Sequence, residues 1–253
     1  LDSTSAGLPV PDYAQSLVDD VKGLRIGLPR EYFAAVTDPG VSELVREALV
    51  LLERMGAIVE EISLPHTQYA LPAYYAIATA EASSNLARFD GVRYGYRHGN
   101  SEDVLSMFMK SRGEGFGPEV KFRTILGTYV LTTGDNDTYY TQATRVRTLV
   151  KKELEEALEK YDVLITPTAP AGTFLLGEKE KKTMDMYFSD LLTIPANLAG
   201  LPALSLPCGF SQGLPVGLQI IGRAFDEATL IRVAYTLEYH IDYQRTIPSL
   251  DVK

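Results

Sequence analysis

The sequence predicts an α/β fold, in which helices cover a sheet, and two observations lead to this prediction. Patterns typical of a strand, a helix and a second strand follow one another between residues 24 and 65, which is the order found in α/β sheets. A long helical pattern later runs directly into another short apolar segment at 162–170. The chain has 253 residues, which is enough to bury a substantial core around such a sheet.

The first strand–helix–strand group is clearly marked. Residues 24–29 (LRIGLP) form a short apolar run that ends in proline, which predicts a buried strand. Asp38 can accept an N–H hydrogen bond at a helix start, and Pro39 suits the first helical position. Apolar residues then recur at helical spacing until Gly56, which can end the helix in a left-handed conformation. Residues 57–65 (AIVEEISLP) predict the next strand.

The middle of the chain alternates between helix and loop patterns. An alanine-rich helix is predicted at 70–88, and a loop rich in glycine and tyrosine at 89–100. A long helix with one apolar stripe is predicted at 143–161. It leads into 162–170 (DVLITPTAP), a short strand that two prolines stop.

The last part predicts two adjacent strands and a helix. The strands lie at 201–210 and 213–222 and are joined by a glycine-containing turn. A closing helix at 226–239 would be capped by Asp226. The charge-dense run at 177–183 (GEKEKKT) is expected to be a solvated loop.

The composition argues against several classes of function. A formal net charge of −9 argues against nucleic-acid binding by this chain alone, because phosphate binding needs a basic face. No apolar run reaches the roughly 18 to 20 uncharged residues that a membrane span needs. A single cysteine rules out an internal disulfide and fits a reducing, cytoplasmic environment.

The one cysteine, Cys208, could be a nucleophile or a packing residue. A reactive thiolate needs a nearby cation, an imidazole or a helix N-terminus. Cys208 instead follows a proline within a predicted core strand, and no histidine lies near it in sequence. Free cysteine is among the most buried residue types, so we interpret Cys208 as a packing residue.

No short motif for a metal, a nucleotide or a nucleophile is found. His66, His98 and His240 are far apart in the sequence, whereas a zinc site needs three or four ligands at close spacing, so no metal is predicted. The glycines of residues 23–29 lack the third glycine of a dinucleotide fingerprint. Neither a nucleophile elbow nor a phosphate-binding loop occurs.

Longer segments resemble a known family, the amidase signature family. In chain order they are SLVDDVKGLRIGLPREYF, EASSNLARFDGVRYGYR, EGFGPEVKFRTILGTYVL, RVRTLVKKELEEALEKYDVLITPTAP, LTIPANLAGLPALSLPCGF and GLPVGLQIIG. The last two are shared by many amidases, whereas the second and third resemble the A-subunit branch of the tRNA-dependent amidotransferases. The resemblance runs along nearly the whole chain, and it implies an α/β fold with a mixed β-sheet core flanked by helices.

The resemblance also implies how this chain relates to a complete enzyme. In the family a lysine and two serines form the catalytic triad, and these would lie before Leu1. Residues 1–253 would then be the C-terminal part of a single amidase domain, without the N-terminal catalytic part and inactive alone. The pair Ser83–Ser84 is no substitute, because it lies in a predicted helix with no flanking glycines. No catalytic residue is therefore predicted in this chain.

By resemblance, three residues would bind the substrate glutamine. Arg123 would hold the α-carboxylate, because a planar guanidinium can donate two parallel hydrogen bonds. Asp190 would hold the α-ammonium, and Tyr74 would line the amide end. Without the family, Arg123 is an ordinary surface residue, Asp190 is the N-cap of a helix, and Tyr74 is a packing ring.

The sequence departs from the family pattern near this site. Asp135 and Asn136 stand where aromatic residues are usual, which removes apolar area and adds charge. The segment is therefore either solvent-facing or part of an altered pocket. Phe122 stands beside Arg123, where a second basic residue is common.

For the complete enzyme the resemblance implies glutamine hydrolysis through a serine acyl-enzyme. The ammonia would serve to convert Glu-tRNA(Gln) or Asp-tRNA(Asn) to Gln-tRNA or Asn-tRNA. The expected partners are the missing N-terminal half and the B and C subunits of the amidotransferase, with tRNA, ATP and Mg²⁺ handled mainly by the partner subunit. This chain would carry no cofactor of its own and would contact no membrane.

Two other functions stay open at this point. A stand-alone amidase of the same family would hydrolyse simple amides without tRNA and without a preference for glutamine. A non-catalytic docking half would keep the fold without turnover, since a fold can be retained when its activity is lost.

Overall fold

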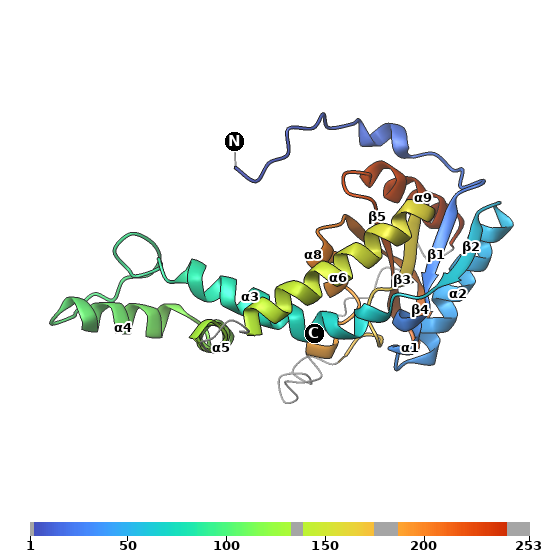
Figure 1. The fold of residues 1–253 in the computed structure, drawn as a ribbon. Helices are drawn as coiled ribbons and strands as arrows, with labels where there is room; N and C mark the ends of the chain where they lie inside the picture. The colour runs from blue at the N-terminus through green and yellow to red at the C-terminus, as the bar shows by residue number, and fades with distance from the viewer. Residues whose placement is uncertain (1–2, 133–138, 175–186, 242–253) are drawn as a thin grey trace, which may run out of the picture. The chain divides into compact units, whose positions relative to one another are not determined.

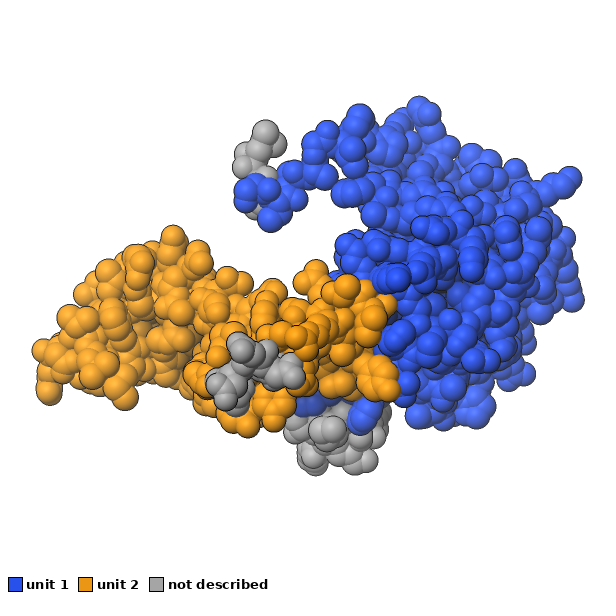
Figure 2. All heavy atoms as spheres, in the orientation of Figure 1, with its two compact units in different colours: residues 1–68, 150–253 blue, residues 69–149 orange. Residues whose placement is uncertain are grey.

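The structure is a computed structural model that describes residues 3–132, 139–174 and 187–241. The chain divides into two compact units (Figure 2). Unit 1 consists of Leu1–Gln68 and Val150–Lys253, and unit 2 consists of Tyr69–Leu149. The expectation of a single amidase domain over residues 1–253 stays a prediction.

Unit 1 is built on a five-stranded mixed sheet (Figure 1). Its strands are β1 (Arg25–Pro29), β2 (Ile58–Ile62), β3 (Val163–Pro167), β4 (Ala203–Ser211) and β5 (Leu214–Gly222), in the order β2-β1-β3-β5-β4. The first three strands of this order run parallel, and β5 and β4 are antiparallel to their neighbours. The predicted mixed sheet is therefore confirmed.

The helical elements of unit 1 surround this sheet. They are η1 (Tyr13–Ser16), α1 (Arg30–Ala34), α2 (Pro39–Arg54), η2 (Pro65–Tyr69, whose last residue begins unit 2), the second part of α6 (Tyr139–Lys160), α8 (Ile194–Ala199) and α9 (Glu227–His240). Apolar residues of α2 and α9 pack on one face of the sheet in a single core, together with Ile26, Val163, Leu218 and Cys208. Successive residues of a strand point to opposite faces of the sheet. Gln219 therefore lies on the other face, where its side chain donates to the Leu192 carbonyl, just before α8.

The helix ends agree with the sequence prediction at α2 and differ at α9. The Asp38 carboxylate accepts a hydrogen bond from the Gly40 N–H at 2.9 Å, as an N-cap does, and Gly56 follows the helix with a φ of 96°. Asp226 precedes α9, but its side chain caps no backbone N–H. Its carboxylate accepts the Thr229 hydroxyl instead, at 2.8 Å. The predicted side-chain cap at Asp226 is therefore wrong.

Unit 2 is formed by helices. They are α3 (Ala70–Leu86), α4 (Val104–Gly115), α5 (Pro118–Thr132) and the first part of α6 (Tyr139–Lys160), which ends in unit 1. Helices α3 and α5 pack very closely, because Gly127 of α5 lies against the backbone of Thr79 of α3. Hydroxyl groups of Ser83 and Thr128 also join the two helices at 2.9 Å. Within the described ranges, no helix is both long and apolar enough to cross a membrane.

Candidate functional site

Arg123 lies on α5 in a small cluster of charged and aromatic side chains. Its Nε donates to the Glu119 carboxylate, one turn earlier, at 2.7 Å. Its guanidinium lies over the ring of Tyr75, 5.6 Å from the centroid, as in a cation–π contact. Tyr75 in turn meets Tyr74 edge to face, with ring centroids 5.3 Å apart. The structure therefore brings Arg123 and Tyr74, two of the three predicted substrate-binding residues, into one cluster.

The surroundings of Arg123 keep it cationic and orient it. The hydrogen bond to Glu119 raises the pKa of the Arg123 guanidinium. One third of the side chain is exposed, at 33%. No described residue accepts a hydrogen bond from its two terminal nitrogens, so the outer edge of the fork is available to an incoming carboxylate.

Asp190 belongs to unit 1 and lies in the turn before α8. Its carbonyl oxygen accepts the N–H groups of Thr193 and Ile194, both at 3.1 Å. Its carboxylate is exposed, and among the described residues it accepts no hydrogen bond. The N-cap position of α8 is Thr193, so the alternative reading of Asp190 as a helix cap is wrong. Because Arg123 and Asp190 lie in different units, their joint clamp on one amino acid stays a prediction.

The two departures from the family pattern have different outcomes. Asp135 and Asn136 lie outside the described residues, and so does the charged run at 177–183. Phe122 is half exposed on α5, at 51%, so this ring does not fill the core of unit 2.

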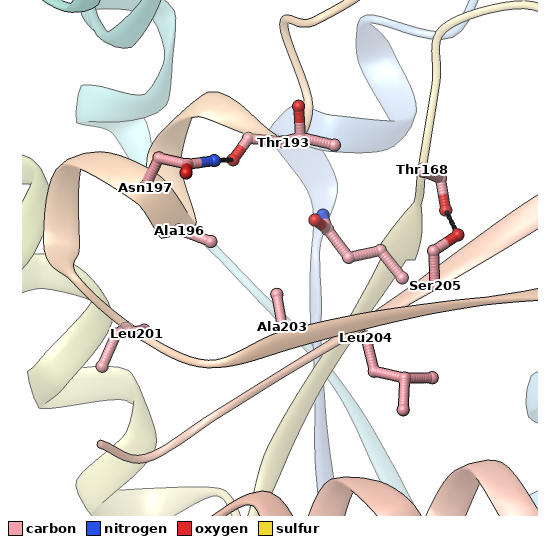
Figure 3. Close-up of a pocket in the computed structure, with 9 residues that line it drawn as sticks. Thr168, Thr193, Ala196, Asn197, Leu201, Ala203, Leu204 and Ser205 are labelled. Atoms are coloured by element: carbon pink, nitrogen blue, oxygen red, sulfur yellow. Dashed lines mark hydrogen bonds between the residues drawn. The ribbon is translucent and has the colours of Figure 1, made fainter. Parts of the chain in front are cut away.

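A pocket of about 350 Å³, lined by five polar and four apolar residues, lies beside the Asp190 turn in unit 1. Thr193 and Asn197 line it from the side of α8, and Thr168 and Ser205 from the sheet side (Figure 3). The Asn197 side chain donates to the Thr193 carbonyl at 2.9 Å, and the Thr168 and Ser205 hydroxyls share a hydrogen bond of 2.8 Å. Gln219 of β5 completes the polar lining.

None of the residues that line this pocket was predicted from the sequence. The signal available was Gln219, a polar side chain in the otherwise apolar run of residues 218–221. Glu119 was also not predicted as a partner of Arg123, although a spacing of four residues on a helix is typical of an ion pair.

Cys208 is a packing residue, as predicted. Its side chain belongs to the apolar core, and the residue is 5% exposed. Burial raises the pKa of the Cys208 thiol to about 12, so at neutral pH it is not a thiolate nucleophile.

The three histidines pair with three different carboxylates. His66 contacts Glu153 at 2.8 Å, His98 contacts Glu114 at 3.0 Å, and His240 contacts Asp19 at 2.9 Å. Within the part of the chain that the structure describes, no group of three metal-binding side chains is found.

Comparison with known proteins identifies the family. The family described as Amidase matches residues 1–231, so the chain belongs to this family. Among relatives, the A subunit of the glutamyl-tRNA(Gln) amidotransferase of Moorella thermoacetica is 60% identical over 252 residues, which is 100% of this chain and 52% of that protein. The protein of the same name from Desulforamulus reducens is 56% identical over 250 residues, 99% of this chain and 52% of that protein.

Solved structures agree with this assignment. The chain is similar to the crystal structure of the glutamyl-tRNA(Gln) amidotransferase A subunit from Thermotoga maritima, with a TM-score of 0.74 and 40% identity over 96% of this chain and 48% of that one. The fold is also similar to that of 6-aminohexanoate cyclic dimer hydrolase, with a TM-score of 0.73 at 20% identity, covering 98% of this chain and 51% of that one. The chain spans about half the length of the curated relatives it matches.

Proposed function

We propose that this chain is the substrate-binding C-terminal half of the glutamine-hydrolysing A subunit of a tRNA-dependent amidotransferase. The observation that carries the proposal is the Arg123 cluster, a cation oriented by Glu119 with its outer edge open. The proposal is supported by relatives of that name, at 52% to 60% identity, that match nearly the whole chain.

Free glutamine presents an α-carboxylate and an α-ammonium, and each needs a partner of opposite charge. Arg123 would donate two parallel hydrogen bonds to the carboxylate, and the exposed carboxylate of Asp190 would accept from the ammonium. Tyr74, held edge-on by Tyr75, would line the amide end. These contacts orient the substrate and take no part in bond breaking.

The nucleophile would come from the lysine and two serines of the family's other half. A serine oxygen would attack the amide carbon, and the C–N bond would break as the nitrogen takes a proton and leaves as ammonia. Water would then hydrolyse the acyl-enzyme to glutamate. This chain alone would be inactive.

The released ammonia would be used to amidate Glu-tRNA(Gln) or Asp-tRNA(Asn). The acidic net charge of −9 supports a division of labour in which the B and C subunits contribute most of the tRNA contact, and in which ATP and Mg²⁺ are used by the partner subunit. The single cysteine supports a cytoplasmic location.

Reconstitution tests this function. The chain is mixed with a separately expressed segment that corresponds to the other half of the relatives, and ammonia release from glutamine is measured. Arg123→Ala and Asp190→Ala are expected to raise KM more than they lower kcat, because both residues bind ground state and transition state alike. Arg54→Ala and Glu53→Ala, exposed residues at the end of α2, serve as controls. Unchanged kinetics in both site variants would contradict the assignment.

A further inference from the structure

Gln219, a polar residue that is almost fully buried, lies at the base of the pocket beside Asp190. Strand register places Gln219 of β5 between Thr166 of β3 and Ser205 of β4. These three polar residues form a row across a sheet face whose neighbouring positions are apolar, such as Leu164 and Ile221. Gln219 itself is 3% exposed.

The Gln219 side chain is fixed in one orientation. Its Nε2 donates to the Thr166 hydroxyl at 2.9 Å and to the Leu192 carbonyl at 3.0 Å. A carbonyl can only accept, so the atom that faces Leu192 must be the amide nitrogen. The carbonyl oxygen Oε1 is therefore the end left for the pocket, and no described residue donates to it. This oxygen is not among the buried side-chain atoms that lack a hydrogen-bond partner, so it is open to the space of the pocket, where a ligand can donate to it.

The rest of the lining combines further polar groups with four alanine and leucine side chains. Gly217 leaves the space that the hydroxyls of Thr168 and Ser205 occupy, since a Cβ there would lie 2.9 Å from the Thr168 oxygen and 3.2 Å from the Ser205 oxygen. On the opposite side of the pocket, the Asn197 amide is tied to Thr193 through its nitrogen (Figure 3). This leaves its carbonyl oxygen as a second acceptor.

The chemistry of the lining restricts the ligand. None of the nine lining residues is charged, so an anion or a cation entering the pocket would lose hydration without meeting an opposite charge. The lining offers two amide oxygens as acceptors and three hydroxyl groups that can accept or donate. A small neutral molecule with N–H donors satisfies both amide oxygens.

We propose that this pocket binds small neutral molecules that carry N–H groups, either a primary carboxamide or ammonia. The role of such a ligand in the reaction rests on the proposed function, since an amide is its substrate and ammonia its product. The binding chemistry itself rests only on the residues of unit 1.

The experiment is a titration of the isotope-labelled chain, followed by NMR of the side-chain amides. Acetamide is expected to shift the Gln219 and Asn197 signals, whereas N,N-dimethylacetamide, which has the same carbonyl but no N–H, and acetate are expected to leave them unchanged. Ammonium chloride is titrated at neutral and at alkaline pH, and ammonia binding predicts a response only at alkaline pH. A response to acetamide identifies the ligand as a primary carboxamide, and a response to ammonium chloride at alkaline pH alone identifies it as ammonia.

Variants separate binding from folding. Gln219→Met and Asn197→Ala are each expected to weaken binding of the neutral probe about 3- to 10-fold, the value of one hydrogen bond. Gln68→Met removes an exposed amide that bonds the Pro65 carbonyl at 3.1 Å, and it should bind like the unaltered chain. If Gln219→Met fails to fold, Asn197→Ala, on an exposed residue, still tests the pocket.

Equal binding of dimethylacetamide and acetamide, no binding of either neutral probe, or full affinity in the folded variants would overturn the inference. The outcome is independent of turnover. Acetamide binding without glutaminase activity in the reconstituted enzyme would support the pocket and refute the proposed function. Glutaminase activity without binding of either acetamide or ammonia would support the proposed function and refute the pocket.

Discussion

The carboxylate of Glu119 lies 2.7 Å from the Nε of Arg123, one helical turn away. The Glu119–Arg123 pair has two opposing effects on the binding of an anion to Arg123. It holds the guanidinium plane in a fixed orientation, and it offsets part of its positive charge. Both effects act on the edge of the guanidinium that faces away from Glu119.

Removing the charge of Glu119 while keeping its acceptor separates these effects. In Glu119→Gln the amide oxygen can still accept from Arg123, but the repulsion of a substrate carboxylate is gone. We expect KM for glutamine in the reconstituted enzyme to fall about 2- to 5-fold, the range of an exposed charge pair. Glu155→Gln, in another exposed pair at the same helical spacing with Lys151, is the matched control. A higher KM in Glu119→Gln would show that the full carboxylate is needed to orient Arg123.

The sequence could identify Arg123 and Tyr74 through the family resemblance, but it could not give their immediate surroundings. No bounds were predicted for the helix α5, because its apolar residues do not form a single stripe, and Phe122 and Ile125 are exposed. Without those bounds, the spacing from Glu119 to Arg123 did not indicate an ion pair. The pocket around Gln219 was harder still to predict from the sequence. It depends on the pairing of β3 with β5, two strands that lie far apart in the sequence.

A second prediction concerns the contact between α3 and α5. A Cβ at Gly127 would overlap the carbonyl group of Thr79, and a backbone group cannot move aside as a flexible side chain can. Gly127→Ala is expected to destabilise the chain by about 1–3 kcal/mol, the usual cost of overpacking. Urea unfolding followed by circular dichroism measures this.

The control for this prediction is Gly113→Ala. Gly113 lies in α4 with open space around its Cβ position, so alanine there should stabilise the helix by about 0.5–1 kcal/mol. If both variants raise the free energy of unfolding, backbone entropy rather than the close approach to Thr79 governs Gly127.

The strands of unit 1 were the best predicted part of the fold. Short apolar runs bounded by proline or glycine, such as 24–29 and 162–170, correspond to β1 and β3 because both strands are buried. The cap at Asp226 failed for a local reason. Its carboxylate is taken by the Thr229 hydroxyl, a side-chain competitor that a single-residue capping rule does not consider.

A third prediction follows from the burial of Cys208. With a thiol pKa of about 12, the reactive thiolate is scarce at neutral pH, and the residue is enclosed by the core. We expect a thiol reagent such as dithionitrobenzoate to label the native chain only at the rate of unfolding, and to label it fully in urea. Rapid labelling of the folded chain would contradict the packing role.

The last prediction uses two glutamates that respond to pH in opposite directions. Burial raises the pKa of Glu153 above its ordinary 4.5, although hydrogen bonds from His66 act against this. Burial also acts to raise the pKa of Glu31, but hydrogen bonds from the Leu64 N–H and the Ser63 hydroxyl outweigh it and hold the pKa below 4.5. The two carboxyl groups should therefore affect stability in different pH windows.

The stability that protonated Glu153 contributes is fully present below pH 4.5 and is lost as pH rises through its raised pKa. That of ionised Glu31 is present above pH 4.5 and is lost as pH falls through its lowered pKa. Relative to Glu153→Gln, the unaltered chain should therefore lose stability toward neutral pH. Relative to Glu31→Gln, it should lose stability on acidification. Urea unfolding of the three proteins across this range measures both differences, and curves of the same sign would show that one of the two carboxyl groups is in a different environment from the one described.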